Sequence, residues 1–407
     1  MAKFASLPVE VRQYLLVTGN YWAFTLTDGA LRMLVVLHFH QLGYSPLAVA
    51  MLFLFYEVFG VVTNLVGGWL GARVGLNATM NAGLFLQVLA LCMLLVPDRL
   101  LTVAWVMAAQ ALSGIAKDLN KMSAKSAIKT LLPSRAQGTL YRWVALLTGS
   151  KNALKGAGFF LGGLLLASWG FREAILAMAL ALAIVWLFSI MKLEKSLGKS
   201  VNKPRFSHLF STSRTVNILA AARLFLFAAR DVWFVVALPV YLSSILGWEH
   251  WAVGAFLASW VIGYGIVQAA APRLTRGGAG RVPDGRTAFC WAVALALVPA
   301  LIAATMVTGF RVEASLLGGL MIFGGLFAVN SALHSYLIVS YARDDGVSLD
   351  VGFYYMANAM GRLLGTLLSG WVYQALGMAH CLVISTVLIA LCAAISLSLP
   401  RHPVVAN

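Results

Sequence analysis

The sequence predicts an all-α integral membrane protein with twelve transmembrane helices in two pseudo-symmetric six-helix bundles. Hydrophobic residues make up 61% of the 407 residues and charged residues 11%, with a mean hydropathy of +0.85, whereas soluble proteins carry about 25% charged residues. Apolar runs long enough to cross a bilayer recur from one end of the chain to the other. A basic stretch near the middle divides these runs into two groups of six.

Windows of about 20 mainly apolar residues place the first six helices at residues 14–40, 48–71, 78–96, 101–128, 140–168 and 173–191. The first run is longer than the apolar core of a signal peptide and no small-residue cleavage site follows it, so we expect it to remain as a helix. Residues 192–214 hold six Lys and Arg with few apolar residues, which predicts a solvated cytoplasmic linker.

The second six helices are predicted at residues 215–244, 252–272, 287–308, 315–341, 350–376 and 380–399. The domain organisation is therefore an N-terminal bundle over 1–191, the linker over 192–214 and a C-terminal bundle over 215–407. Weak matches between the halves, such as Asn152-Ala-Leu with Asn358-Ala-Met, indicate a duplicated unit. In such transporters the solute site lies between the halves near the bilayer midplane.

Basic residues are distributed unevenly among the connections. With the amino terminus inside, the cytoplasmic segments hold 18 Lys and Arg, and the outer loops hold only Arg99, Arg172 and Arg311. Because basic loops are retained on the cytoplasmic side, we expect both termini to be cytoplasmic.

Charged residues inside the predicted helices are mostly basic. The nine bases are Arg32, Lys117, Lys121, Lys125, Lys151, Lys155, Arg223, Arg230 and Arg362, and the four acids are Asp28, Glu57, Asp118 and Asp231. Each Lys or Arg facing lipid at a helix centre would cost about 2.5 to 3.5 kcal/mol, so these side chains must face protein or water. Since four acids cannot neutralise nine bases, we expect a mobile anion in a hydrated cavity to complete the site.

The fourth helix carries Lys117, Lys121, Lys125 and Lys129 at four-residue intervals, which stacks them along one side over about 18 Å. Lys151 and Lys155 in the fifth helix have the same spacing and are candidates for a facing wall. In the alternative interpretation the fourth helix leaves the bilayer near Gly114 and its lysines form a solvated extension.

The roles of the acidic residues Asp28 and Asp231 are open to two interpretations. Asp28 and Arg32, four residues apart, form a favourable intrahelical pair, and Arg230 adjoins Asp231, so either pair is a structural contact or part of the solute site. Arg223 and Arg362 have no acid within a helical turn and are better solute candidates, because the guanidinium fork suits phosphate, arsenate and carboxylate oxygens.

Glu57 and Asp118 are either proton-exchanging groups, if burial raises their pKa, or fixed partners of neighbouring lysines. The neutral candidates for the substrate site are His334, Tyr355 and Asn358. A lone helical histidine is also a common packing residue.

No catalytic or cofactor motif is present. The sequence has no G-x-x-x-x-G-K-[ST] phosphate loop, no H-E-x-x-H and no G-x-S-x-G. The four cysteines show no metal-ligand spacing. We therefore expect a gradient-driven transporter with no cofactor, no metal and no enzymatic activity.

Gly68-Trp-Leu-Gly-Ala-Arg-Val-Gly75 resembles the loop motif between helices 2 and 3 of the major facilitator superfamily. Ala72 stands where the family has an acid and Leu76 where it usually has a base, which puts the family's loop charge clamp in doubt. The resemblance implies the major facilitator fold and alternating access.

Segments 18–32, 112–125 and 149–156 resemble the ArsJ organoarsenical efflux permeases. The resemblance extends over nearly the whole chain, and these segments carry its most recognisable residues. That resemblance implies export of 1-arseno-3-phosphoglycerate, arsenate resistance, a functional partnership with an arsenate-using glyceraldehyde-3-phosphate dehydrogenase and a bacterial cytoplasmic (inner) membrane location. We further expect a monomer among membrane lipids, with a small anionic substrate and no nucleic acid.

Two alternatives compete with this interpretation. One is an organophosphate/phosphate exchanger or another organic anion carrier. The other is a membrane scaffold or receptor whose basic cavity binds anionic lipid. The membrane potential favours export of a polyanion by about 2.3 kcal/mol per charge per 100 mV, so export does not require proton coupling.

Overall fold

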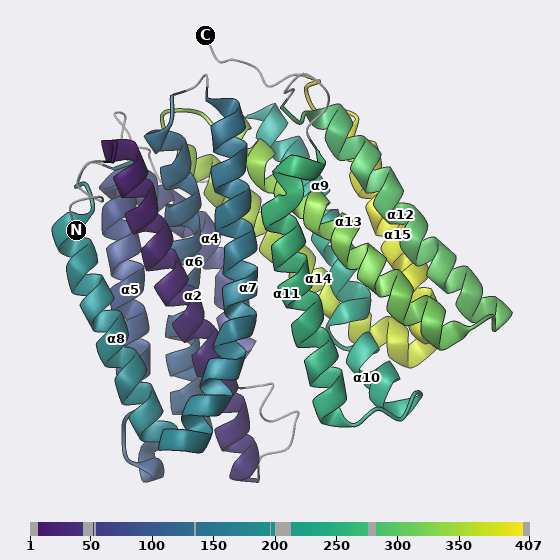
Figure 1. The fold of residues 1–407 in the computed structure, drawn as a ribbon, viewed down its shortest axis with the longest axis horizontal. Coiled ribbons are helices and arrows are strands. Elements are labelled where there is room, and N and C mark those ends of the chain that lie inside the picture. Colours follow the sequence, from purple (N-terminus) through teal and green to yellow (C-terminus); the bar gives the residue numbers. More distant parts are fainter. Residues whose placement is uncertain are drawn as a thin grey trace. The chain divides into compact units, whose positions relative to one another are not determined.

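The computed structural model describes residues 7–43, 52, 54–133, 136–195, 197–199, 213–275 and 282–401, except for the side chains of His40, Gln41, Leu54, Glu57, Asp98, His250 and Trp251. All regular structure within these residues is helical (Figure 1). Each of the twelve predicted spans corresponds to helix at nearly the predicted place, which confirms the predicted fold class.

The first six spans are α2 (Val9–Gln41), α4 (Leu54–Val74), α5 (Leu76–Met93), α6 (Val103–Leu131), α7 (Gln137–Trp169) and α8 (Phe171–Lys192). The next six are α9 with α10 (Arg214–Phe234 and Ala237–Ser244), α11 (His250–Leu274), α12 (Gly285–Thr308), α13 (Val312–Tyr341), α14 (Val347–Leu376) and α15 (Met378–Ser396). By length and apolar composition alone, seven of the described spans could cross a membrane.

The seventh predicted span is broken. α9 ends at Phe234 and α10 begins at Ala237, and two β-branched residues, Val235 and Val236, occupy the break. The Ser369 hydroxyl of α14 accepts hydrogen bonds from the backbone N–H groups of Val236 (3.3 Å) and Ala237 (3.1 Å). Broken spans are tolerated where neighbouring side chains satisfy the freed backbone groups.

The chain divides into two compact units. Unit 1 is Met1–Pro133, Ser150–Phe210 and Ala342–Met356, and unit 2 is Ser134–Gly149, Ser211–Tyr341 and Ala357–Asn407. α7 and α14 therefore each contribute to both units. The predicted division of the sequence into two bundles stays a prediction, and most of the predicted linker lies outside the described residues.

In unit 1, α6 packs against α2, α4 and α5, and α8 packs against α2 and α5. Phe24, Leu84, Val106 and Ile175 belong to the apolar core that these helices share. α6 is thus surrounded by protein along much of its length, which explains how a helix with four lysines is accommodated.

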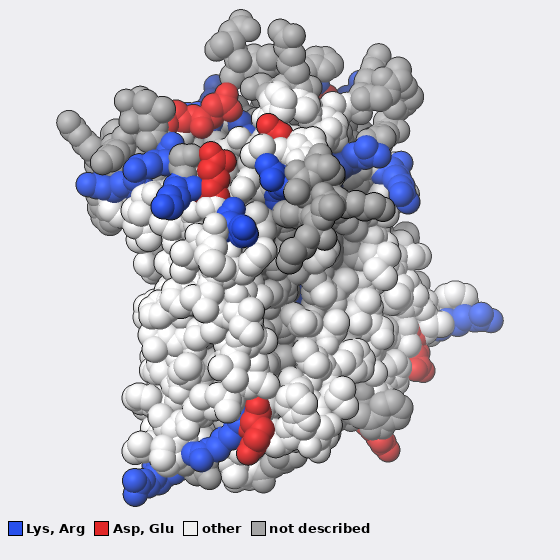
Figure 2. Space-filling view, turned by 60° about the vertical axis from the view of Figure 1, so that its left-hand side comes forward, with Lys and Arg blue, Asp and Glu red and all other residues white. Residues whose placement is uncertain are grey.

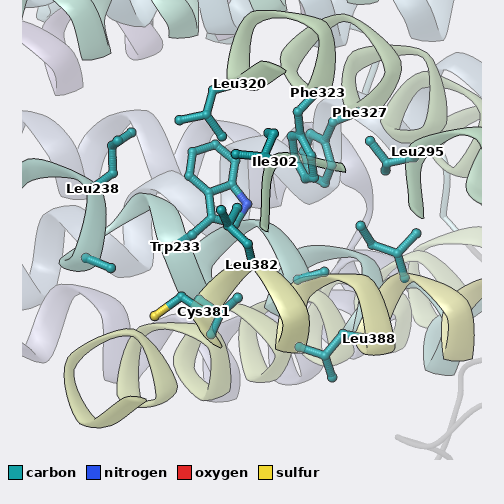
Figure 3. Close-up of a cluster of buried hydrophobic side chains, with 14 of the residues drawn as sticks. Trp233, Leu238, Leu295, Ile302, Leu320, Phe323, Phe327, Cys381, Leu382 and Leu388 are labelled. Atoms are coloured by element: carbon teal, nitrogen blue, oxygen red, sulfur yellow. The ribbon is translucent and has the colours of Figure 1, made fainter. Parts of the chain in front are cut away.

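In unit 2, α9 packs against α15 and α13, and α12 packs against the same two helices. Part of the apolar core of this unit is drawn in Figure 3. At its centre Trp233 meets Phe323 edge to face, with ring centroids 5.0 Å apart. This aromatic packing holds α9, which carries three of the predicted site residues.

Large apolar side chains cover much of the outer surface. On the face shown in Figure 2, most charged side chains lie near the upper and lower edges or at the right-hand edge, and most of the described surface between them is uncharged. Exposed residues such as Leu180 and Ile184 on α8, or Leu301 and Val307 on α12, would be unfavourable in water but not in lipid. The chain is a multi-pass membrane protein.

Candidate functional site

α6 is a continuous helix through the predicted lysine row. Lys125 is only 2% exposed, and the side chains of Lys117, Lys121 and Lys129 are 14–17% exposed. The alternative interpretation, in which this row is a solvated extension, is therefore wrong for Lys125. The row is enclosed by protein, so each ammonium group must be compensated locally.

Asp118 compensates two of these lysines. Its carboxylate lies 2.5 Å from Nζ of Lys121 and 3.9 Å from Nζ of Lys117. Asp118 is buried against α4, where a Cβ at Gly60 would come within 3.0 Å of its Oδ2. Of the two roles predicted for Asp118, this geometry provides the lysine partnership.

Tyr56 of α4 links α2 and α6. Its hydroxyl donates to Oδ1 of Asp28 at 2.7 Å. Its ring faces Nζ of Lys117 at 3.8 Å and the guanidinium of Arg32 at 5.0 Å from the centroid. Lys155 of α7 lies 3.9 Å from the other oxygen of Asp28, so Asp28 has partners from α4 and α7.

The ring of Tyr355 on α14 faces two basic side chains, as the ring of Tyr56 does. Nζ of Lys121 and Nζ of Lys125 lie 4.8 Å and 4.9 Å from its ring centroid, and Lys125 also donates a hydrogen bond to the Tyr355 hydroxyl. Tyr355 was predicted as a neutral candidate for the substrate site, and within unit 1 it is a partner of the lysine row.

The segment that carries Tyr355 is attached to α4 and α6. Ser348 donates to the carbonyl of Gly68 at 2.8 Å, and a Cβ at Gly68 would come within 2.5 Å of the Ser348 carbonyl. Lys129 donates to the carbonyl of Ala342 and lies 3.3 Å from Asp344. Gly68, the first glycine of the motif, is thus needed for close packing, and it lies within α4, as the predicted helix over 48–71 implies.

A second cluster lies inside unit 2 around Arg223, which is 3% exposed. Its Nε donates to Oδ1 of Asn358 at 2.8 Å, and a terminal nitrogen donates at 3.3 Å to both the carbonyl and the hydroxyl of Ser331. Gln268 donates to the same hydroxyl at 3.0 Å. Neutral groups from α13 and α14 therefore orient this buried guanidinium, and Gln268 of α11 supports one of them.

His334 follows Ser331 by one turn of α13 and is fully buried. Neither of its ring nitrogens hydrogen-bonds to another residue in the described part of the chain. Buried polar atoms are nearly always satisfied in proteins, and an oxyanion or a water molecule can satisfy an imidazole nitrogen. This supports the solute role proposed for His334 over a packing role.

Asp231 connects the remaining arginines. Its carboxylate lies 2.5 Å from Arg230 and 3.3 Å from Arg362. Arg362 has no acid within a helical turn of its own helix, as predicted, but it has an acidic partner on the neighbouring helix α9, which local sequence spacing does not reveal. Arg230 also faces the ring of Phe227 at 4.9 Å, and Arg223 faces the same ring at 3.9 Å.

The structure thus gathers most predicted site residues into two clusters, one in each unit. Lys151 is half-buried on α7, and the side chain of Glu57 lies outside the described residues. Tyr56, Phe227, Gln268 and Ser331 were missed, because uncharged residues in apolar helices give no sequence signal of their own. Both clusters present fixed, partly buried cations, which is the chemistry of an anion site.

A sequence model of the Major Facilitator Superfamily matches residues 15–310. No curated protein sequence matches the chain. The structure of the human organic anion transporter MFSD10 (TETRAN) is similar with a TM-score of 0.74 and 16% identity, covering 96% of this chain and 100% of that one.

A bacterial homologue of the iron transporter ferroportin in an outward-facing state has a TM-score of 0.75 and 13% identity, covering 96% and 99% of the two chains. The E. coli fucose:proton symporter FucP has a TM-score of 0.73 and 13% identity, and the match covers 96% of this chain and 98% of that one. At such identities the similarity establishes the fold alone.

Proposed function

Because the chain belongs to the major facilitator superfamily, we propose that it is a secondary transporter whose substrate is a small organic polyanion. Membrane transport is the function that the family implies. The anionic substrate is our inference from the two clusters of basic side chains.

The observation that carries this proposal is the charge balance of the clusters. Of the four acids predicted for the site, the three with described side chains each pair with one or two bases: Asp28 with Lys155, Asp118 with Lys117 and Lys121, and Asp231 with Arg230 and Arg362. Bases outnumber acids nine to four in the predicted site. Burying such an excess is unfavourable, and a bound anion would offset that cost.

For the substrate itself we propose 1-arseno-3-phosphoglycerate. Support comes from the segments that resemble ArsJ permeases, and from the Arg223 cluster, whose guanidinium edge and amide suit tetrahedral oxyanions. The protein would then export the arsenylated acid made by a glyceraldehyde-3-phosphate dehydrogenase and so confer arsenate resistance. Alternating access in a bacterial inner membrane, with both termini cytoplasmic and the chain a monomer, completes the proposal.

Transport in everted membrane vesicles tests this proposal. Vesicles from cells that express the protein would be supplied with glyceraldehyde 3-phosphate, the dehydrogenase, its dinucleotide and arsenate, so that the arsenylated acid forms outside them. We expect arsenic to accumulate only when all components are present. The Arg223→Gln variant should abolish accumulation, whereas Arg286→Gln, at an exposed position at the start of α12, should not.

The rival functions give different results in the same vesicles. An organophosphate exchanger would take up labelled 3-phosphoglycerate against internal phosphate and would not require arsenate. A lipid-binding scaffold would move none of these solutes. Either result would contradict the proposed substrate, and the second would contradict transport altogether.

A further inference from the structure

Three buried aromatic rings each face two basic side chains. The pairs are Arg32 and Lys117 at Tyr56, Lys121 and Lys125 at Tyr355, and Arg223 and Arg230 at Phe227. Six of the nine bases predicted for the solute site are therefore held over an aromatic face. Each pair lies wholly within one unit.

An aromatic face attracts a cation through the negative side of its quadrupole, and more strongly where water is excluded. It does so without carrying a net charge. A carboxylate in the same place would hold the cations more tightly but would neutralise them. Lys117, Lys121 and Arg230 also have carboxylate partners, and the rings reduce the remaining cost of burying the cations without adding negative charge to the clusters.

The geometry at Phe227 shows how a ring can hold a cation that also binds a ligand. The guanidinium of Arg223 lies 3.9 Å from the ring centroid, while its nitrogens donate to Asn358 and Ser331. Stacking on a ring uses the flat face of a guanidinium, and hydrogen bonds use its edge. The ring contact therefore does not compete with hydrogen bonding at the edge, where an oxyanion would share the donors that also bind Asn358 and Ser331.

We propose that Tyr56, Tyr355 and Phe227 are positioning residues of the anion site, each holding two cations ready for an oxyanion. This inference rests on the proposed anion-transport function. It assigns a specific part to residues that carry no charge, and it predicts that substrate affinity depends on the electron density of a ring that does not touch the substrate.

Phe227 provides the sharpest test, because it has no hydroxyl whose hydrogen bonds would change. Phe227 would be replaced by mono-, di- and trifluorinated phenylalanine, which lowers the electron density of the ring with little change of shape. Phe323 is the matched control: it lies in the same core and contacts Trp233 and Phe327, with ring centroids 5.0 Å and 5.7 Å away. Affinity for 3-phosphoglycerate and melting temperature would be measured in nanodiscs of neutral lipid.

We expect the Kd for 3-phosphoglycerate to rise with each added fluorine at Phe227, by roughly 3- to 30-fold in total. Phe227→Leu should weaken binding at least as much. Phe227→Trp keeps an electron-rich face, so its Kd should lie within about threefold of the wild-type value. The Phe323 series should leave the Kd unchanged.

A Kd that stays constant across the Phe227 series while the wild type binds would overturn the positioning role and leave the anion site standing. A lower melting temperature without a change in Kd would also overturn the positioning role, since the ring would then only stabilise the fold. If the wild type binds neither 3-phosphoglycerate nor inorganic phosphate, the proposed anion site fails and the positioning role fails with it.

Discussion

The Nε of Arg223 donates to Oδ1 of Asn358 at 2.8 Å, so an amide of α14 fixes a guanidinium of α9 inside unit 2. This contact places a permanent cation in a buried setting and sets the direction of its hydrogen-bonding edge. A point charge alone would not be oriented in this way, and orientation separates arginine from lysine at this position.

Arg223→Lys is therefore expected to fail although it conserves charge. An ammonium group cannot reproduce the donation from one nitrogen to Asn358 and from another to Ser331 while facing Phe227. We expect the Kd for 3-phosphoglycerate, measured by titration calorimetry, to rise about tenfold or more. Arg286→Lys should bind as the wild type does, and wild-type affinity in Arg223→Lys would show that orientation is unimportant.

Asp231 is expected to be essential for stability because its carboxylate forms ion pairs with two arginines at once. Asp231→Asn leaves Arg230 and Arg362 without that charge, and removing one member of a buried ion pair costs about 3 kcal/mol or more. The melting temperature in detergent should fall clearly. Adding Arg362→Gln should restore part of the loss, and a single variant as stable as the wild type would contradict this role.

Gly68 is expected to tolerate no side chain. A Cβ there would approach the Ser348 carbonyl to 2.5 Å, whereas a Cβ at Gly263 of α11 would meet nothing within 4 Å. Gly68→Ala should lower the melting temperature by disturbing the packing of residues 342–356 on α4, and Gly263→Ala should not. Equal effects of the two substitutions would mean that helix propensity, not packing, governs the result.

Two substitutions test the arsenate phenotype. Lys121→Ala removes the closer partner of Asp118, and Arg362→Ala removes a partner of Asp231. Each is expected to abolish growth on arsenate in a sensitive bacterial host while a fluorescent fusion still reports membrane expression. Arg99→Ala, at an exposed position, is the control. Growth of either variant like the wild type would remove that residue from the site.

The helices could be predicted because a bilayer demands long apolar segments, and such segments are visible in sequence. The break between Phe234 and Ala237 could not be, because Val235 and Val236 are as apolar as their neighbours. What permits the break is the Ser369 hydroxyl, which lies 133 residues from Val236 along the chain. Contacts of this kind follow only from the packing of helices.

The candidate site was predictable to the extent that it is charged. Lys117, Lys121 and Lys125 are conspicuous in an apolar helix, and their four-residue spacing placed them correctly on one side. Tyr56 and Phe227 were not predictable, because aromatic residues are common in membrane cores and nothing in their spacing distinguishes a ring that faces a cation. Whether the predicted residues bind substrate stays a prediction.

Anomalous diffraction at the arsenic absorption edge tests most directly whether the buried bases hold a mobile anion. Crystals of the protein would be grown with arsenate as a probe of the oxyanion group. We predict an arsenic peak within hydrogen-bonding distance of Arg223 or of the lysines of α6. Arsenic found only at exposed residues such as Arg99, with every basic side chain of the clusters enclosed by protein groups, would contradict it.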